Sequence, residues 1–406
     1  MLRRLLCLAL PAAIGLLAQS VPQLRRQADA LKAKGDAAGA LALTERAAAA
    51  EPRSAELQDE AGFLLAVLGR SAEAKTRFDR AIELDGRYAA AYFHLGVTYW
   101  LEKDPNRAIP LLQSAVRLAP DSADYRLKLA LAFLEVSHPQ ESVDELKVAT
   151  RLQPGNAEAW NTLGIALQQT GAVRDASAAY AKAVELASAN LAARNSYGFM
   201  LVQLREPAQA MAQFNKVLEL DPKNTAALIN IGFTWLQKGE FQKAEQSFRA
   251  ALRIDAGSAV AHYNLGLSLK QQDQLDEAKT EFLEAIRLDG DLPEAHYTLG
   301  MTVWQLGDPD ETARQMQAAI AQRPEYGQAH YLLGSALKQK GDLPGALQAL
   351  RSAARLLPED PGPYNMIGQV LRIQGDAEGS KAAFAEGARI KAKKEAEQVQ
   401  ALRQKK

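Results

Sequence analysis

Apolar residues recur along the chain at helical spacing, in short segments that are separated by turn-forming residues. In the stretch 157–190, Trp160 and Leu163 lie on one apolar face of a segment that ends at Gly171. Tyr180 and its apolar neighbours form a second face after that glycine. This spacing predicts two short helices joined by a tight turn. Isolated helices of about 12–15 residues are marginal in water, so each must pack its apolar face against a neighbour.

The same pattern returns every 34 residues, and no insertion breaks the register. Three positions of this unit hold small side chains, and among the 33 such positions only Val217 is larger. The small position inside the first helix is occupied by Ala28, Gly62, Gly96, Ala130, Gly164, Gly198, Gly232, Gly266, Gly300, Gly334 and Gly368. Large residues share one position of the second helix, namely Phe78, Leu112, Leu146, Tyr180, Phe214, Phe248, Phe282, Met316, Leu350 and Phe384. A glycine inside a helix costs about 0.8–1 kcal/mol relative to alanine. We therefore interpret the register as a packing device, in which small residues against large ones make a continuous core between stacked helix pairs.

These residues resemble the tetratricopeptide repeat. The matching set in one unit is Trp160, Leu163, Gly164, Leu167, Ala176, Tyr180 and Ala183. Six of the eleven units also have the closing proline, at Pro52, Pro120, Pro154, Pro222, Pro324 and Pro358. The resemblance implies an all-α fold, a right-handed α-α superhelical solenoid of about eleven 34-residue helix-turn-helix repeats. The repeats start at residues 21, 55, 89, 123, 157, 191, 225, 259, 293, 327 and 361, so the solenoid spans 21–394.

The length of the chain is consistent with a solenoid, and its charge and motifs reduce the number of possible functions. A chain of 406 residues exceeds the roughly 250–300 at which a single core stops growing. The 48 basic and 48 acidic residues balance, so there is no basic bias that would favour nucleic acid. The sequence has no nucleophile elbow, phosphate loop or dinucleotide fingerprint, and the repeats leave no stretch for a catalytic domain. We therefore expect no enzymatic activity, no cofactor and no small-molecule substrate.

The first twenty residues have the pattern of an export signal. Two arginines precede an apolar run from Leu5 to Ala18, and small residues hold the −3 and −1 places of a cut before Val21. This three-part pattern is typical of a secretory signal peptide over 1–20, which predicts an extracytoplasmic protein, in a bacterial periplasm or secreted. The alternative is an uncleaved anchor, and membrane contact is expected only in that case. The one cysteine, Cys7, lies in this segment, so the mature chain would be cysteine-free.

Residues 395–406 form a basic extension after the last repeat. From Gly387 to the end the chain has no further glycine or proline and more lysine and arginine than glutamate, which predicts a basic helix. We interpret it as a solvating helical extension that frays at its tip. The alternative is a contact for an acidic partner or a membrane surface. Truncation at Ile390 distinguishes them, because unchanged binding would eliminate the contact.

The resemblance also implies where a ligand would lie. Positions within a repeat are counted from its first residue. In proteins of this kind, positions 2, 5, 9, 12 and 13, all on the first helix, line the concave side of the superhelix. Carried over to this chain, these positions give an apolar and aromatic groove that contains Phe63, Phe93, Val97, Trp100, Leu127, Leu131, Ile165, Phe199, Phe233, Tyr263, Tyr297, Met301, Trp304 and Tyr331. Soluble monomers rarely expose contiguous apolar patches, so we predict that this groove binds a peptide or protein segment. The alternative is that tight winding, ordinary helix packing or a homo-oligomer buries these residues.

Asparagines on the same helices are candidate contacts to a peptide backbone. Asn161, Asn195 and Asn365 hold position 5, and Asn230 and Asn264 hold position 6. A side-chain amide offers both the donor and the acceptor that a peptide bond needs. The alternative is polar filler on a helix face. Some relatives grip a carboxy-terminal carboxylate with lysine at position 5 and asparagine at position 9, and no repeat here has that pair.

Histidines recur at position 4 of three consecutive repeats, as His262, His296 and His330. Metal ligands must converge at about 2 Å, whereas equivalent residues of stacked helices lie about 8–10 Å apart. We therefore interpret these histidines as packing substitutes for the tryptophan of the repeat pattern, and we expect no metal site.

Together these observations predict a non-catalytic scaffold or adaptor for protein–protein interaction. It would bind a peptide or protein segment in the concave groove, in an extracytoplasmic compartment. One alternative is a self-associating structural protein whose groove is occupied by its own copy. Another is a membrane-tethered assembly factor of an envelope complex. The size of the purified protein and its amino-terminal sequence distinguish among these.

Overall fold

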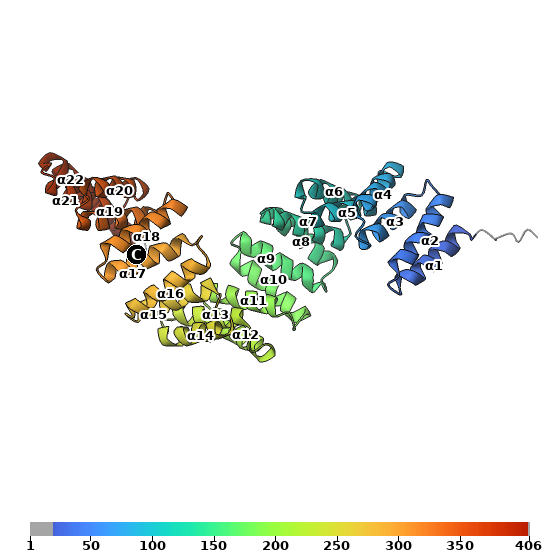
Figure 1. Ribbon diagram of the computed structural model, residues 1–406, viewed down its shortest axis with the longest axis horizontal. Helices are drawn as coiled ribbons and strands as arrows, with labels where there is room; N and C mark the ends of the chain where they lie inside the picture. Colours follow the sequence, from blue (N-terminus) through green and yellow to red (C-terminus); the bar gives the residue numbers. More distant parts are fainter. Residues whose placement is uncertain (1–18, 405–406) are drawn as a thin grey trace, which may run out of the picture. The chain divides into compact units, whose positions relative to one another are not determined.

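The computed structural model describes residues 19–404, and the side chains of residues 19–398. Residues 1–18, which hold most of the predicted signal peptide, lie outside the described range. Within that range the chain forms helices joined by short turns and contains no strand (Figure 1). No helix between residues 19 and 404 combines the length and the apolar composition that crossing a bilayer requires.

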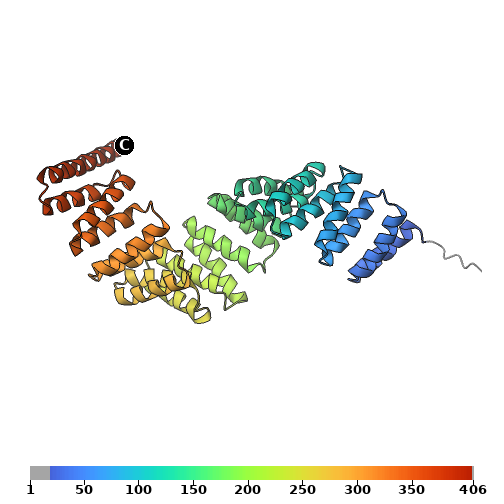
Figure 2. The ribbon, with the colours of Figure 1, turned by 45° about the horizontal axis from the view of Figure 1, so that its top comes forward.

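The helices alternate as first and second members of pairs (Figure 2). The first helices are α1 (Val21–Lys32), α3 (Ala55–Val67), α5 (Ala89–Leu101), α7 (Ala123–Glu135), α9 (Ala157–Gln169), α11 (Leu191–Gln203), α13 (Thr225–Gln237), α15 (Ala259–Gln271), α17 (Pro293–Gln305), α19 (Gly327–Lys340) and α21 (Pro361–Ile373). The second helices are α2 (Ala37–Ala50), α4 (Ser71–Leu84), α6 (Pro105–Leu118), α8 (Pro139–Leu152), α10 (Val173–Leu186), α12 (Pro207–Leu220), α14 (Phe241–Ile254), α16 (Leu275–Leu288), α18 (Pro309–Gln322), α20 (Leu343–Leu356) and α22 (Ala377–Gln404). The described chain is an all-α solenoid of packed helix pairs, which confirms the predicted fold class.

The helix pairs form two compact units, Met1–Ala193 and Arg194–Lys406, whose boundary falls within α11. Within the first unit, α3 contacts α5 and α5 contacts α7. Within the second unit, α17 contacts α19 and α19 contacts α21. Consecutive second helices make no comparable contacts in the described part of either unit. The first helices are therefore the inner layer of each unit, and the second helices are the outer layer.

Each first helix approaches its own second helix closely at the small position of the repeat. A Cβ atom added to Gly164 would lie 2.6 Å from the ring of Tyr180, and one added to Gly232 would lie 2.6 Å from the ring of Phe248. Glycine is required at both positions because a side chain would overlap the ring. In the fourth repeat, Ala130 takes this position and is fully buried. The predicted packing of small residues against large ones is confirmed.

One residue with a left-handed backbone follows each first helix of the described chain. In seven repeats it is a glycine with φ between 75° and 84°, namely Gly35, Gly69, Gly171, Gly239, Gly307, Gly341 and Gly375. In the other four it is Lys103, Ser137, Arg205 or Asp273, with φ between 59° and 62°. This conformation costs an ordinary L-residue about 1–2 kcal/mol, whereas glycine adopts it freely. The turn between paired helices therefore has one geometry, whichever residue occupies it.

The last helix, α22, continues without a break from the final repeat to Gln404. Lys391 Nζ lies 3.9 Å from Glu395 Oε1, and Lys393 Nζ lies 3.7 Å from Glu397 Oε1 and 3.6 Å from Glu359 Oε1. These lysines and their partners are exposed. Part of the positive charge at this end of the chain is thus balanced by the chain's own carboxylates.

Candidate binding face of the first helices

The predicted groove residues lie on the inner layer of each unit. We call the side chains at positions 5, 6, 9, 12 and 13 of the first helices the inner face. Of the nineteen predicted residues, which are the fourteen groove residues and the five asparagines, Phe63, Ile165 and Asn365 are exposed, the first two at 45% and 37%. Leu127 and Asn195 are buried, at 3% and 8%. The other fourteen are half-buried. Most of these side chains therefore pack against a neighbouring helix on one side and meet solvent on the other, while Leu127 and Asn195 belong to the packing between helices.

In the first unit, rings from α3, α5 and α7 contact one another. Phe93 stacks on Tyr125 with ring centroids 4.2 Å apart, and the His94 ring lies 5.3 Å from that of Phe63. His94 Nδ1 lies 2.8 Å from Oδ1 of Asp59, whose side chain is 5% exposed. Burial, with the nearby Asp59 charge, raises the pKa of Tyr125. Sequence reasoning missed Asp59, His94 and Tyr125, although Asp59 holds position 5, one of the positions that the resemblance assigns to the groove.

Two further apolar side chains of the first unit are more exposed than any predicted residue. Val67 of α3 is 59% exposed and Leu101 of α5 is 68% exposed. Both hold position 13, and each lies one turn beyond a predicted residue of its own helix, Phe63 or Val97. The resemblance named position 13, but sequence reasoning did not single out these two residues. Together the four side chains extend the apolar part of the inner face.

In the second unit, aromatic residues also meet, both between neighbouring first helices and between a first helix and the residue that precedes the next one. The rings of Phe199 and Phe233 lie 6.0 Å apart, and those of Tyr297 and Tyr326 lie 4.8 Å apart. Burial raises the pKa of both tyrosines, that of Tyr326 to about 12. An open pocket of about 440 Å³ is lined by Trp304, Tyr331, Leu332, Ser335, Lys338, Gln339 and Met366.

The predicted asparagines divide into two groups. Asn195 Nδ2 donates to Oδ1 of Asn224, the capping residue of α13, over 3.1 Å. Asn264 Nδ2 donates to a backbone carbonyl of its own helix over 2.8 Å. The half-buried side chains of Asn161 and Asn230 make no hydrogen bond within residues 19–404. The exposed side chain of Asn365 likewise makes no hydrogen bond with the described residues, so three of the five predicted amides are available to a peptide backbone.

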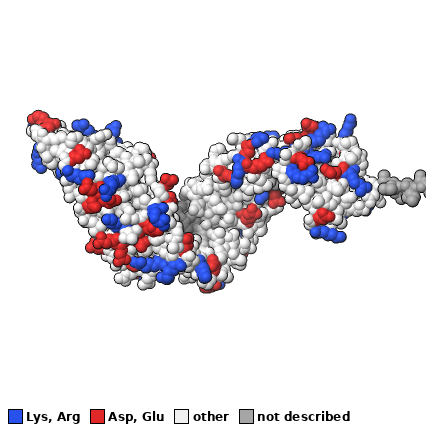
Figure 3. Space-filling view, in the orientation of Figure 1, with Lys and Arg blue, Asp and Glu red and all other residues white. Residues whose placement is uncertain are grey.

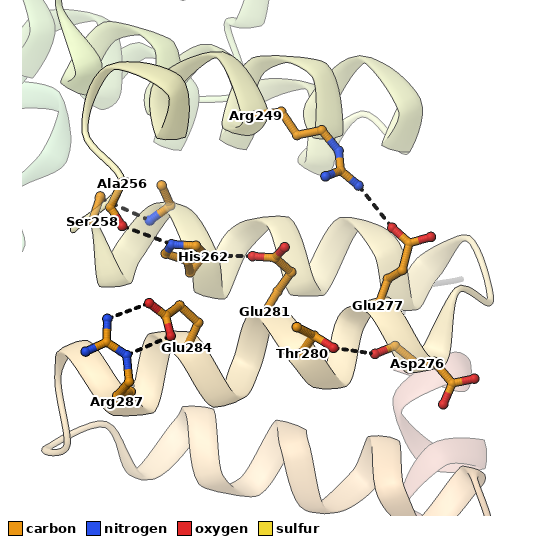
Figure 4. A network of polar contacts seen from close by, with 11 residues as sticks. Arg249, Ala256, Ser258, His262, Asp276, Glu277, Thr280, Glu281, Glu284 and Arg287 are labelled. Atoms are coloured by element: carbon orange, nitrogen blue, oxygen red, sulfur yellow. Dashed lines mark hydrogen bonds and ion pairs between the residues drawn. The ribbon is translucent and has the colours of Figure 1, made fainter.

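His262 is held between a loop and a second helix. Its Nδ1 lies 2.6 Å from Glu281 Oε2 of α16, and its Nε2 lies 3.2 Å from the carbonyl oxygen of Ala256, in the loop before α15 (Figure 4). The side chains of His262 and Glu281 are 14% and 19% exposed. Residues 19–404 contain no group of three or more His, Cys, Asp and Glu side chains placed to hold a metal ion.

In other repeats, the residue at position 4 also contacts a carbonyl oxygen of the preceding loop. Trp160 Nε1 and Arg126 Nε each donate to the carbonyl oxygen six residues upstream, over 2.9 Å. His330 Nε2 lies 2.9 Å from the corresponding carbonyl oxygen, that of Pro324. His296 instead contacts a glutamine of its own second helix, with Nδ1 at 2.6 Å. His262 and His330 thus make the same contact with the preceding loop as Trp160 does in its own repeat.

Charges of both signs are interspersed on the surface of each unit that Figure 3 shows. Many of them pair between neighbouring repeats: Lys103 Nζ lies 2.7 Å from Glu135 Oε1, and Lys340 Nζ lies 2.6 Å from Asp310 Oδ1. Exposed pairs of this kind contribute about 0–1 kcal/mol each. The view shows no large area of one sign.

Family comparisons identify the helix pairs. Residues 60–123 and 297–361 match the tetratricopeptide repeat, and residues 267–307 match the TPR repeat. Residues 140–261 match the TPR domain of cytochrome c-type biogenesis protein H. The chain therefore carries tetratricopeptide repeats, as the resemblance implied. A comparison with curated proteins gave no match.

Solved structures share the fold at low sequence identity. YrrB, described as a TPR protein with an unusual peptide-binding site, is 24% identical, with 45% of this chain and 95% of YrrB covered and a TM-score of 0.42. MamA is 23% identical, with 40% and 95% covered and a TM-score of 0.39. The human IFIT1 dimer with m7Gppp-AAAA is 14% identical, with 84% and 90% covered and a TM-score of 0.46. The likeness to these three proteins is one of fold alone.

Proposed function

We propose that this protein is a non-catalytic scaffold that binds a peptide or protein segment on its inner face. It would need no cofactor, small-molecule substrate or nucleic acid. One observation carries the proposal: the first helices present apolar side chains that are only partly covered, and Phe63, Val67 and Leu101 are 45%, 59% and 68% exposed. Covering such side chains removes apolar surface from water, which is the main favourable term in most protein association.

The composition of the inner face supports a protein partner. Aromatic residues are enriched in protein interfaces, where a few large side chains carry most of the binding energy. On this chain they are already held by neighbours, as the stacking of Phe93 on Tyr125 illustrates, so little side-chain entropy would be lost on binding. Asn161 and Asn230 would meet the backbone of the bound segment through their amides.

We further propose that the protein works in an extracytoplasmic compartment, a periplasm or the secreted space, after cleavage before Val21. The basic, apolar and small-residue parts of 1–20 support this. Mass spectrometry of the native protein from cell fractions tests it. A mature chain that begins at Val21 outside the cytoplasm is expected. An intact chain in the membrane fraction would overturn cleavage and favour the tethered assembly factor.

The inner face is tested with the double variant Val67→Glu and Leu101→Glu. Both side chains are mostly exposed, so the charges should leave folding intact while opposing apolar binding. The matched control is Leu220→Glu with Leu283→Glu, on the outer helices α12 and α16, where the side chains are 53% and 43% exposed. Each protein is used as bait in envelope extract, and its melting temperature and mass in solution are measured.

We expect the wild type and the control pair to capture the same protein and the inner-face variant to lose it. Melting temperatures within about 2 °C of one another would show that the fold is intact in all three. Identical capture by all three would refute the proposal. A wild-type dimer that becomes monomeric only in the inner-face variant, with no partner lost, would favour the self-associating protein.

A further inference from the structure

Lys338 of α19 is a half-buried cation on the inner face whose partners are neutral. Its Nζ donates to Oε1 of Gln369 over 2.5 Å and lies 3.5 Å from the sulfur of Met366, both on α21. No carboxylate between residues 19 and 404 forms an ion pair with it. A partly desolvated charge without a counter-charge is unfavourable, so the site would gain from an added anion.

Lys340, two residues further along the same helix, differs from Lys338 because it has a carboxylate partner. Lys340 Nζ lies 2.6 Å from Oδ1 of Asp310, so its charge is already balanced. Two of the three ammonium hydrogens of Lys338 are donated, one to an amide oxygen and one to a thioether sulfur. The thioether is a weak acceptor. At least one donor of Lys338 therefore remains for an incoming carboxylate.

Lys338 is also part of the lining of the 440 Å³ pocket of the second unit. Trp304 comes from α17, Tyr331 and Leu332 from α19, and Met366 from α21, so three successive first helices supply apolar walls. Trp304, Tyr331 and Met366 are half-buried and thus still present apolar surface to the opening. An apolar side chain in this pocket would lie next to the ammonium group of Lys338.

We propose that this pocket takes an apolar side chain of an extended partner segment, and that Lys338 binds an aspartate or glutamate side chain directly beside it. The inference deepens the proposed function and rests on it. The carboxylate is placed inside the segment rather than at its carboxyl terminus. The inner face continues on both sides of the pocket, with Tyr297 and Met301 before it and Asn365 after it, so the segment has room to pass through.

Methionine methyl NMR of the full chain provides the test. Met366 reports on the pocket, and Met301 of α17 reports on the inner face beside it; each signal is assigned by replacement with leucine. The probes are capped glycine–serine peptides that carry, at their centre, a phenylalanine followed by an aspartate or by an asparagine. A third peptide has no capped end and terminates in the phenylalanine, so its only carboxylate is terminal.

We expect the aspartate peptide to shift the Met366 signal and to bind about tenfold more tightly than the asparagine peptide and the terminal-carboxylate peptide. Lys338→Gln should remove this difference. Lys340→Gln, the matched control, should keep it. Lys338→Glu should reverse it, so that a peptide with lysine in place of aspartate binds more tightly.

Five outcomes would overturn the inference. Equal affinity for the aspartate and asparagine peptides would remove the acidic preference, and so would a difference that persists in Lys338→Gln. Tighter binding of the terminal-carboxylate peptide would assign the site to a chain end. If the peptides shift Met301 but not Met366, the proposed binding face stands and the pocket does not. If neither signal moves, this inference fails, and the capture experiment with the Val67 and Leu101 variant still decides the proposed function.

Discussion

Gly164 lies against the ring of Tyr180 so closely that a Cβ atom on Gly164 would be 2.6 Å from the nearest ring carbon. By helix propensity alone, Gly164→Ala should stabilise the protein by about 1 kcal/mol. The overlap with the ring opposes this and costs about 1–3 kcal/mol in a well-packed core. We expect a net loss, seen as a melting temperature lower by roughly 2–6 °C.

The fourth repeat supplies the rescue for this variant. There Ala130 takes the place of Gly164, and Leu146 takes the place of Tyr180, and both are fully buried. Adding Tyr180→Leu to Gly164→Ala should therefore recover stability, whereas Tyr180→Leu alone leaves a cavity and should not. Gly155→Ala is the control, because a Cβ there meets nothing within 4 Å. Additive losses in the double variant would contradict the close-packing argument.

The turn at Arg205 gives a prediction of the opposite sign. Arg205 is exposed and has φ 62°, a backbone conformation that costs an L-residue about 1–2 kcal/mol. Glycine removes that cost but adds backbone freedom to the unfolded chain. We expect Arg205→Gly to stabilise the protein by about 0.5–1 kcal/mol, measured by urea denaturation. Arg174→Gly, in the first turn of α10, should destabilise it instead. A loss of stability in Arg205→Gly would show that the turn is not strained.

Replacement of His262 tests its structural role. His262→Ala removes the contact with the Ala256 carbonyl and leaves Glu281 without its partner, so we expect a loss of about 1–2 kcal/mol. His262→Trp should recover part of it, because Trp160 donates to the equivalent carbonyl in its own repeat. A chelator should leave the wild-type melting temperature unchanged. A clear rise with added zinc would contradict the packing role and point to a metal site.

The fold could be predicted because the sizes of the residues in each repeat show which positions pack against one another. Glycine at 164 opposite tyrosine at 180 is a local pattern, and its return every 34 residues fixes the partner of each helix. The turn at Lys103 could be placed by its register with glycines such as Gly171, although nothing in a lysine itself indicates a left-handed backbone.

The inner face was less predictable because its contacts join different repeats. Asp59 and His94 lie 35 residues apart, at position 5 of one repeat and position 6 of the next, so a pattern read within one repeat does not reveal their contact. Likewise, Leu127 and the exposed Phe63 hold neighbouring groove positions in the pattern, yet one is 3% exposed and the other 45%. Burial there depends on the size of the side chains on the adjacent helices.

Acid sensitivity should arise in part from a contact between Glu294 and Arg323. The guanidinium group of Arg323 donates to the Glu294 carboxylate and lowers the pKa of Glu294 against the opposing effect of burial. Glu294 is at the start of α17 and Arg323 at the end of α18, so the contact stabilises their packing. The pKa of Glu294 is lower in the folded protein than in the unfolded chain, where it is about 4.3. The stabilisation is therefore present above pH 4.3 and is lost as the pH falls through the lower, folded-state pKa. Both side chains are more than a third exposed, so it should be below about 1 kcal/mol.

We therefore expect Glu294→Gln to melt below the wild type at pH 7, by no more than about 2–4 °C, and the two curves to converge near pH 3. Thermal denaturation in low-salt buffers between pH 7 and pH 3 measures this. Glu325→Gln, an exposed replacement close by, should follow the wild type throughout. High salt should narrow the gap at pH 7, because exposed charges are screened. If the difference in melting temperature between the wild type and Glu294→Gln instead grew on acidification, the ionised carboxylate would not be the stabilising form. The contact would then not stabilise the folded protein.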